Sequence, residues 1–249
     1  MQARAVAPAG VSRRCIVARG RAPLRVLAAA TPKLRLIYFG LPGRAETIRV
    51  LLNVGKIPFE DYTISREQWA EVKPTMPYGQ VPVLEVDGKQ LAQSSAIERY
   101  AARLAGLYPQ DAWEAAKVDE IASFMNEWLD AFVSTFSIKD ADERLAARKA
   151  VAQGPLQTKI AKLNTLLTEA GPDGYLVGGR MTYADVAVYV MTSNIICGFF
   201  DGVPRDLYRP FPAITAFHTR MASVPQIRDM YQGVTEGVRM AFKAGAASA

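Results

Sequence analysis

The pattern of apolar and polar positions predicts a small α/β unit in the first half of the chain. Residues 34–39 form a strand-like run that Pro42 and Gly43 end, and apolar residues at helical spacing then continue to Gly55. Further elements are predicted in this order: a strand over 59–64, a short helix over 68–72, a hairpin over 83–91 that turns at Asp87-Gly88, and a helix over 94–106 that Ser94 or Ser95 would cap. The order β-α-β-α-β-β-α indicates an α/β domain.

Strand patterns stop after residue 109, and apolar residues recur every three or four positions. Two amphipathic helices are predicted from the rows Val118, Ile121, Met125, Trp128, Phe132 and Leu156, Ile160, Leu163, Leu167. A third begins at the capping box Thr182 to Asp185, and shorter helical patterns cover 213–221 and 226–231. We therefore expect an α/β domain over 33–109, an all-helical domain over 110–240 and a flexible tail over 241–249.

Charge changes this picture only at the amino terminus. The 249 residues carry 30 Lys+Arg and 24 Asp+Glu, and residues 1–30 hold six arginines and no acid, so the remainder is balanced at 24 against 24. An acid-free segment rich in Arg and Ala is typical of an organelle transit peptide. We expect residues 1–32 to be a disordered, cleaved transit peptide for the chloroplast, with the mitochondrion as the alternative destination. The other interpretation is a basic tail for nucleic acid, but the segment lacks aromatic residues that stack on bases.

Several classes of protein are disfavoured by what the sequence lacks. No segment offers about 18 uninterrupted apolar residues, so we expect no membrane span. Beyond the amino-terminal segment there is one cysteine, Cys197, and the chain has one histidine, His218. A disulfide framework, a metal site and Ser-His-Asp hydrolysis are therefore not expected. Cys197 lies in an apolar helical segment, where burial would keep its thiol inert.

A first candidate for chemistry is Tyr38, at the end of the opening strand and six residues before Arg44. A tight turn between a strand and a helix brings the helix amide groups near the tyrosine hydroxyl. Such a hydroxyl could donate a hydrogen bond to a thiolate and hold it ionised. The alternative is that Tyr38 is an ordinary half-buried aromatic residue.

A second candidate is the segment Gly79 to Leu84, followed by Gln93-Ser94. The Val81–Pro82 bond is a candidate for the cis form, which would turn the backbone of Val81 outward toward an extended peptide ligand. Ser94 at the start of a helix would add donors for a carboxylate. Taken as structure alone, the same residues are a turn and a helix cap.

Together these segments resemble the glutathione transferase superfamily, from about Lys33 to residue 240. The run Tyr38 to Glu46 is similar to the Y-F-x-x-x-G-R-A-E signature of the sigma-type enzymes, which include glutathione-dependent prostaglandin D synthases. Other segments match that class in order and spacing: Trp69 with Lys73, Gly79–Leu84, Glu85–Gly88, Gln93–Ser94, Val118–Ile121 and Thr182–Asp185. The resemblance implies a thioredoxin-like domain followed by an all-helical domain, usually in a homodimer.

The resemblance also implies a role for each matching position. Tyr38 would stabilise the thiolate of glutathione, and Arg44 would support that tyrosine. The residues implied to bind glutathione are Tyr38, Trp69, Lys73, Gln80, Val81, Pro82, Gln93, Ser94 and, from the partner subunit, Asp119. In this scheme Trp69 and Lys73 hold the glycine end, Val81 the cysteinyl backbone, Gln93 and Ser94 the γ-glutamyl end, and Asp119 its amine.

The implied reaction needs a thiolate, because a free thiol has a pKa near 8.5 and only its ionised form is a good nucleophile. The thiolate would attack a hydrophobic electrophile in an apolar pocket, for which the candidates are Phe39, Met125, Trp128 and Phe199. Conjugation, hydroperoxide reduction and isomerisation all stay open. The turn from Tyr38 to Arg44 has no cysteine, which disfavours disulfide exchange. The alternative from another class is a non-catalytic module that binds glutathione or hydrophobic ligands.

Overall fold

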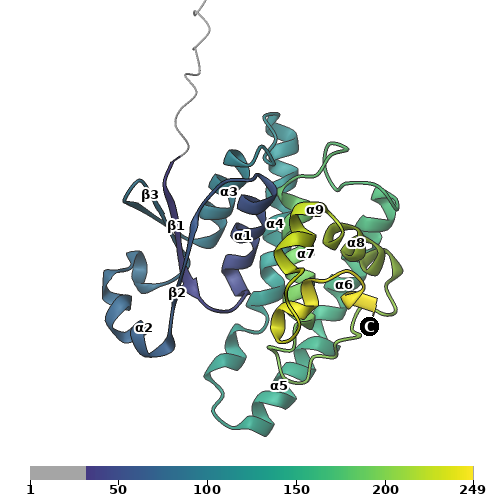
Figure 1. Cartoon of the computed structure of the whole chain (residues 1–249). Helices are drawn as coiled ribbons and strands as arrows, with labels where there is room; N and C mark the ends of the chain where they lie inside the picture. Colours follow the sequence, from purple (N-terminus) through teal and green to yellow (C-terminus); the bar gives the residue numbers. More distant parts are fainter. Residues whose placement is uncertain (1–31, 249) are drawn as a thin grey trace, which may run out of the picture. The chain divides into compact units, whose positions relative to one another are not determined.

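A four-stranded mixed sheet organises the first half of the computed structural model, which describes residues 32–248 (Figure 1). The strands are β1 (Leu34–Phe39), β2 (Glu60–Ile64), β3 (Val83–Val86) and β4 (Lys89–Ala92). They lie in the order β2-β1-β3-β4, with β1 parallel to β2 and antiparallel to β3, which forms a hairpin with β4. The predicted turn Asp87-Gly88 closes that hairpin, and both residues have the positive φ that such a turn requires.

Both faces of the sheet are covered, because β1 buries alternate residues on opposite sides. Leu34, Leu36 and Tyr38 belong to the main core, whereas Ile37 belongs to a smaller cluster. Figure 1 shows α1 and α3 on one side of the sheet and α2 on the other. These helices are α1 (Glu46–Val54), α2 (Arg66–Val72) and α3 (Ser94–Leu104). The alternation therefore turns Tyr38 toward the side on which α1 lies.

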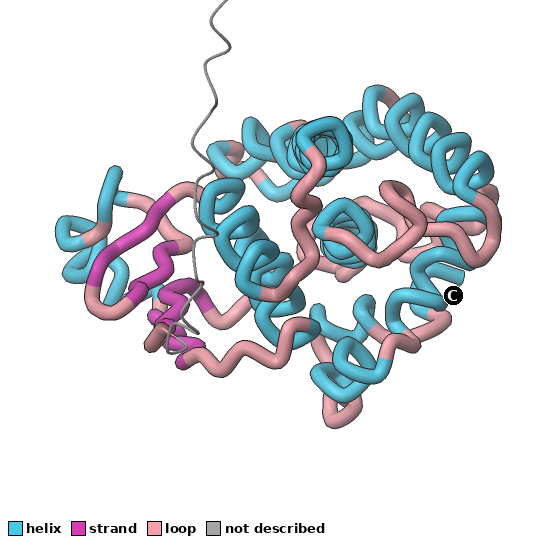
Figure 2. Tube along the Cα trace, turned by 90° about the horizontal axis from the view of Figure 1, so that it is seen from above, coloured by secondary structure: helices cyan, strands magenta, loops and turns pink. Residues whose placement is uncertain are grey.

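The second half is all-helical, as predicted, and Figure 2 shows the strands gathered at one end of the described residues and helices making up the other. Its α-helices are α4 (Ala112–Asp130), α5 (Ala141–Gln153), α6 (Pro155–Ala170), α7 (Tyr183–Ile196), α8 (Pro212–Ala222) and α9 (Pro225–Tyr231). Every residue of α7 is buried, and this helix contacts α4, α8 and α1. A thioredoxin-like half and a helical half thus share one core, and the predicted fold class is confirmed.

The capping box that predicts α7 is present. The backbone N–H of Thr182 donates to Oδ2 of Asp185 at 2.8 Å, and the N–H of Leu176 donates to Oδ1 at 3.0 Å. Burial raises the pKa of the Asp185 carboxyl, while these donors oppose the rise. The box therefore fixes both the start of the buried helix and the loop before it.

Helix α5 has no counterpart among the predicted elements. Its buried residues are only Arg148 and Ala152, so the sequence shows no apolar row at helical spacing. Arg148 donates to the hydroxyl of Thr135 at 3.2 Å and pairs with Asp201 at 3.2 Å. The helix is thus held by one charged side chain and by Ala152 in the core, and so short an apolar contact explains why periodicity did not indicate it.

The expectation of a flexible tail from residue 241 is wrong for residues 241–248. Two short 3₁₀ helices, η5 (Val238–Phe242) and η6 (Ala246–Ser248), form there. Phe242 is 1% exposed and stacks on Tyr231 with ring centroids 5.0 Å apart, while its carbonyl accepts a hydrogen bond from the hydroxyl of Tyr189. Burial of one large aromatic side chain is worth about 1.5–3 kcal/mol, and together with the burial of Ala241 and Ala247 it favours an ordered segment.

The expected transit peptide, residues 1–32, lies outside the described residues except for its last position. Within residues 32–248, no helix has the length and hydropathy needed to cross a membrane.

Candidate functional site

The turn after β1 sets the position of Tyr38. After Gly40 the chain turns and enters the 3₁₀ helix η1 (Gly43–Ala45), which leads directly into α1. The backbone N–H of Arg44 donates to the Tyr38 hydroxyl oxygen at 3.2 Å. Gly43 has φ +47°, and a Cβ at this position would lie 2.7 Å from that oxygen. Glycine is therefore required here both by the backbone conformation and by the space that the hydroxyl occupies.

The Tyr38 hydroxyl is a protonated donor at neutral pH. The residue is 8% exposed, and this burial raises the pKa of the hydroxyl above 10, although the Arg44 N–H and the Arg44 and Arg49 charges oppose the rise. The oxygen already accepts a hydrogen bond from the backbone, and no acceptor for its own proton is found among residues 32–248. The proton is thus available to a group that enters the adjoining cavity.

A buried charge network holds the turn, and the sequence reasoning did not find it. Arg49, on α1, donates to Oε2 of Glu46 at 2.8 Å, to Oδ2 of Asp61 at 2.8 Å and to the carbonyl of Leu41 at 3.1 Å. Burial lowers the pKa of the Arg49 guanidinium, but the two carboxylates outweigh it and the net shift is upward. The available signal was a charged pair three residues apart inside an otherwise apolar helix.

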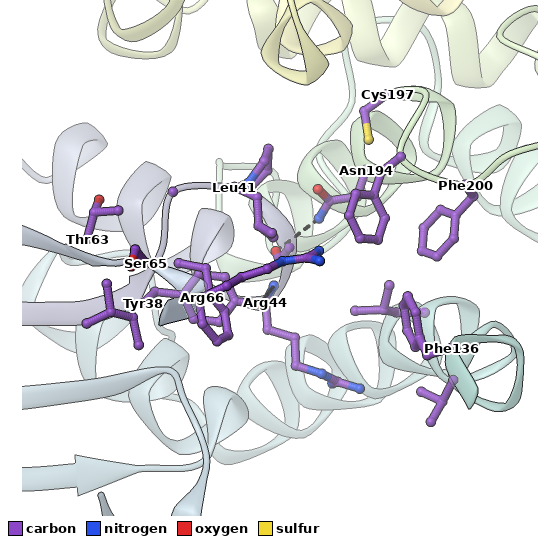
Figure 3. A pocket seen from close by; sticks show the side chains of 18 residues that line it. Tyr38, Leu41, Arg44, Thr63, Ser65, Arg66, Phe136, Asn194, Cys197 and Phe200 are labelled. Atoms are coloured by element: carbon purple, nitrogen blue, oxygen red, sulfur yellow. Dashed lines mark hydrogen bonds between the residues drawn. The ribbon is translucent and has the colours of Figure 1, made fainter. Parts of the chain in front are cut away.

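Tyr38 lines a cavity of 650 Å³, here called the first cavity, between the turn and the helical half (Figure 3). Its other walls come from the β1–α1 turn, the start of α2, the end of α4 with η4 (Val133–Ser137), and the segment that follows α7. Asn194, near the end of α7, donates to the carbonyl of Gly43 at 3.1 Å and so ties the helical half to the tyrosine turn.

Of the four residues predicted to line an apolar pocket, Phe39 and Phe199 do line the first cavity. Met125 and Trp128 do not; they are 1% and 0% exposed and belong to the core. The prediction for these two is wrong because they occupy the face of α4 that packs in the core, whereas the cavity is reached farther along the chain. Its apolar walls there are Leu129, Val133, Phe136 and Phe200.

A second cavity, of 460 Å³, shares Phe39 and Arg44 with the first. Its remaining lining residues are Trp69, Pro77, Gly79, Gln80, Val81, Pro82, Ala92, Gln93 and Ser94. Six residues predicted for one binding site, from α2, the loop before β3 and the start of α3, thus line one cavity. The Val81–Pro82 peptide bond is cis.

The start of α3 differs from the sequence expectation. The residue that precedes the helix is Gln93, with φ 71°, and neither Ser94 nor Ser95 caps it with a side chain. Ser94 is the first helical residue, and the backbone N–H of a first helical residue has no partner inside its helix. Its amide and hydroxyl are therefore available at the wall of the second cavity.

Three predicted binding residues lie outside the second cavity of this chain, and one of them, Tyr38, lines the first cavity. Lys73 is exposed at the start of the 3₁₀ helix η2 (Lys73–Thr75), and its side chain runs beside Gly79. Asp119, on α4, accepts from Nε of Arg99 at 2.8 Å and from the Tyr108 hydroxyl at 2.9 Å. With Arg103 and Tyr108 it lines a separate groove along α3 and α4.

Cys197 follows the last turn of α7 and lines the first cavity, where Figure 3 shows its sulfur. Burial raises the pKa of the thiol, although backbone donors and Arg205 oppose the rise, so it stays protonated and unreactive at neutral pH. In the part of the chain that the structure describes, no three His, Cys, Asp or Glu residues come together as metal ligands would.

Glu98 is a second buried acid that the sequence reasoning missed. It lies on α3, is 4% exposed and accepts a hydrogen bond from the hydroxyl of Tyr183 at the start of α7. Burial raises the pKa of its carboxyl to about 7, against the opposing effects of Tyr183, Arg44 and Arg99. The signal in the sequence was a single acid on the apolar face of α3, between Ile97 and Ala101.

We expect Glu98 to make stability depend on pH. Its pKa is about 7 in the folded chain and about 4.3 in an unfolded one. Its contribution is therefore fully present below about pH 4 and is lost as the pH rises toward 7. Between pH 5 and 8, the stability of the wild type relative to Glu98→Gln should fall by on the order of 2–3 kcal/mol, measured by urea unfolding. The exposed Glu120→Gln is the control, and parallel profiles for the wild type and Glu98→Gln would contradict the assignment.

Comparison with known proteins connects this geometry to a family. Residues 34–103 match the family described as the glutathione S-transferase N-terminal domain, and residues 126–232 match the corresponding C-terminal domain. Glutathione S-transferase 4 of Caenorhabditis elegans is 34% identical over 80% of this chain and 95% of its own length. Hematopoietic prostaglandin D synthase of Gallus gallus is 32% identical over 79% of this chain and 94% of its own length.

Solved structures agree with these matches. The structure of prostaglandin synthase D of Nilaparvata lugens superimposes with a TM-score of 0.74 at 30% identity, covering 82% of this chain and 100% of its own. Both domains are thus matched, in sequence and in fold, over nearly the whole length of the relatives. The chain belongs to the glutathione transferase family and is a glutathione-dependent transferase.

Proposed function

We propose that the Tyr38 hydroxyl, while keeping its proton, donates a hydrogen bond to the sulfur of glutathione and so stabilises the thiolate, which attacks a small hydrophobic electrophile in the first cavity. The single observation that carries this proposal is the hydroxyl itself, which accepts from the Arg44 N–H, stays protonated and has its own proton free. Lowering a thiol pKa by two units requires about 2.7 kcal/mol. One hydrogen bond to a charged group supplies about 1.5–3 kcal/mol.

In this proposal the second cavity holds the peptide part of glutathione. Glutathione is an extended tripeptide analogue with two carboxylates and one ammonium group, and such a ligand calls for amide donors and local charges. Val81 would pair with the cysteinyl backbone, and Gln93 with Ser94 would bind the γ-glutamyl carboxylate. Trp69, Gln80 and Pro82 would form the walls, and Lys73 would reach the glycine carboxylate from the rim. Because Phe39 and Arg44 line both cavities, the sulfur of a ligand held in the second would lie near the Tyr38 hydroxyl.

The test is retention of the protein on glutathione resin, combined with turnover of a chlorinated aromatic electrophile. For conjugation, a carbon–sulfur bond forms, the carbon–chlorine bond breaks and chloride leaves with the electron pair. Parallel assays with an organic hydroperoxide and with an endoperoxide would reveal reduction or isomerisation. A protein that binds glutathione but turns over none of these compounds would favour the alternative, a non-catalytic binding module on the same fold.

Gly43 offers a test of the tyrosine position by a matched pair of variants. Gly43→Ala and Gly88→Ala both place a side chain at positive φ, which costs about 1 kcal/mol of stability. Only the first puts a Cβ 2.7 Å from the Tyr38 oxygen, since nothing lies within 4 Å of a Cβ at Gly88. We expect roughly tenfold loss of kcat/KM for Gly43→Ala alone, because a displaced donor loses transition-state stabilisation. Equal activity of the two variants would contradict the assigned role of the turn.

The proposal includes a homodimer. Tyr78, in the 3₁₀ helix η3 (Pro77–Gly79), is 78% exposed beside the second cavity, as an interface aromatic would be. Asp119 lies in the groove along α3 and α4, which suits a role toward the glutathione of a second copy. Light scattering that gives a monomer mass at micromolar concentration would contradict this part.

We also propose that residues 1–32 direct import into the chloroplast, with the mitochondrion as the alternative. The support is the six arginines and the absence of acids in residues 1–30. Fusion of residues 1–32 to a fluorescent reporter tests it, and a reporter left in the cytosol would contradict it.

A further inference from the structure

The first cavity is apolar except at a few points, and two of those are cations. Arg44 and Arg66 both line it, together with aromatic and aliphatic side chains from η4 and from the segment after α7. A guanidinium at the wall of an apolar cavity needs a counter-charge or water. Which of the two arginines already has a carboxylate partner therefore decides which of them can bind an anionic ligand in the cavity.

The Arg44 guanidinium already has a carboxylate partner within the chain. Its guanidinium donates to Oδ1 of Asp130 at 2.7 Å, and its backbone N–H holds the Tyr38 hydroxyl. Its charge is thus neutralised within the chain, and binding a ligand anion would require competition with Asp130.

Arg66, by contrast, has no such carboxylate partner among the described residues. No carboxylate of residues 32–248 lies within ion-pair distance of its guanidinium. The adjacent Glu67 senses its charge without pairing with it. In Figure 3 the Arg66 side chain extends across the cavity toward Asn194. The residue is exposed, so water solvates this charge in the free protein, and no carboxylate of the described residues competes with a ligand for it.

Folding does not explain a cation at this position. Arg66 is the first residue of α2, where the helix dipole disfavours positive charge. The start of the helix is fixed by the Ser65–Gln68 capping box, in which each side chain bonds the other's backbone N–H, so the arginine adds nothing there. Because the capping box fixes the backbone at the start of α2, it also fixes the position of the Arg66 backbone beside the cavity.

The opposite part of the cavity is apolar and open. Val133 and Phe136, in η4, are 48% and 51% exposed although both line the cavity. The partly exposed Phe199 continues this surface, and the buried Phe200 also lines the cavity. An apolar chain lying there would cover side chains that are otherwise in contact with water, a gain of about 25 cal/mol per Å².

We propose that the first cavity selects electrophiles in which an apolar chain carries a carboxylate, with Arg66 as the residue that recognises that carboxylate. This inference rests on the proposed function and names its substrate class. A chain of this kind would place its carboxylate at Arg66, its apolar part against η4 and the segment after α7, and its reacting carbon near Tyr38. In the reaction, the glutathione thiolate adds to the carbon–carbon double bond of an α,β-unsaturated ketone. The sulfur forms a bond to the β-carbon and the π electrons shift to give an enolate. A proton from water is then transferred to the α-carbon.

The experiment compares a long-chain fatty acid that contains an α,β-unsaturated ketone with the methyl ester of the same compound. The wild type should favour the acid in kcat/KM. Arg66→Gln should lose up to about fivefold in kcat/KM with the acid and less than twofold with the ester, because one exposed charge pair is worth at most about a factor of five. Arg66→Lys should keep most of the preference, and the exposed Arg209→Gln, away from the cavity, should keep all of it. Raising the salt concentration should lower the wild type's ratio of kcat/KM for the acid to kcat/KM for the ester, because salt screens the charge pair.

The outcomes separate this inference from the function on which it rests. Equal kcat/KM values of the wild type for the acid and the ester would overturn the inference. Equal losses of kcat/KM with both compounds in Arg66→Gln would also overturn it, because they would indicate a structural role for Arg66. In either case, turnover of a small uncharged chlorinated aromatic compound would leave the proposed conjugation standing. Absence of that turnover in the wild type would overturn the proposed function itself, and this inference with it.

Discussion

Replacing Tyr38 with Phe should lower kcat/KM for conjugation by roughly 10- to 1000-fold, the scale of removing one positioned donor from a reacting centre. The ring would keep its place in the core, and the one hydrogen bond lost inside the chain is that from the Arg44 N–H. Affinity for glutathione should change little. The pKa of the bound thiol should rise toward 8.5, and the ultraviolet absorbance of the thiolate as a function of pH would measure it.

The matched control for Tyr38→Phe is Tyr62→Phe. Tyr62 lies opposite Ile37 on the neighbouring strand and lines neither cavity, so loss of its hydroxyl should leave turnover unchanged. Full activity of Tyr38→Phe, or an unaltered thiol pKa, would assign thiolate stabilisation to another group.

The second large effect is expected at Glu46, on stability. Its carboxylate is 1% exposed and accepts from Arg49 at 2.8 Å, from the Tyr231 hydroxyl at 2.8 Å and from Nε of Arg239 at 3.4 Å. Glu46→Ala leaves the buried Arg49 with only Asp61 as an anionic partner. Breaking a buried pair in this way costs about 3–5 kcal/mol, so the midpoint of urea unfolding should fall sharply.

An exposed glutamate provides the comparison for Glu46→Ala. Glu120 pairs with Lys117 on the surface of α4, where such pairs contribute about 0–1 kcal/mol, so Glu120→Ala should change the free energy of unfolding by less than 1 kcal/mol. A loss of similar size in the two variants would mean that the network around Glu46 contributes no more than a surface pair.

Features encoded by neighbouring residues were predictable from the sequence. The hairpin at Asp87-Gly88 depends on the backbone preferences of two residues, and the start of α7 on the local pairing of Thr182 with Asp185. The convergence of the loop before β3 with the start of α3 followed from the resemblance to a family, because spacing alone does not bring distant segments together.

Features set by long-range packing were not predictable in the same way. A row of apolar residues on α4 cannot tell whether it faces a core or a cavity, so Met125 and Trp128 were expected where Val133 and Phe136 are found. Arg49 pairs with Asp61, 12 residues away, and Glu98 accepts from Tyr183, 85 residues away. The sequence around a charged residue does not show which distant residue will bind it. Phe242 shows the same limit, since its stacking partner lies on a different element.

The central position of α7 has a consequence for cooperativity. Its first residue, Tyr183, donates a hydrogen bond to Glu98 on α3, Asn194 in its last turn donates to the carbonyl of Gly43, and the helix also contacts α1. A fragment ending after α3 would therefore lose the partners of both the tyrosine turn and a buried acid. The two halves are interdependent, and calorimetry should record a single heat-absorption peak for them, with no separate melting of the thioredoxin-like half.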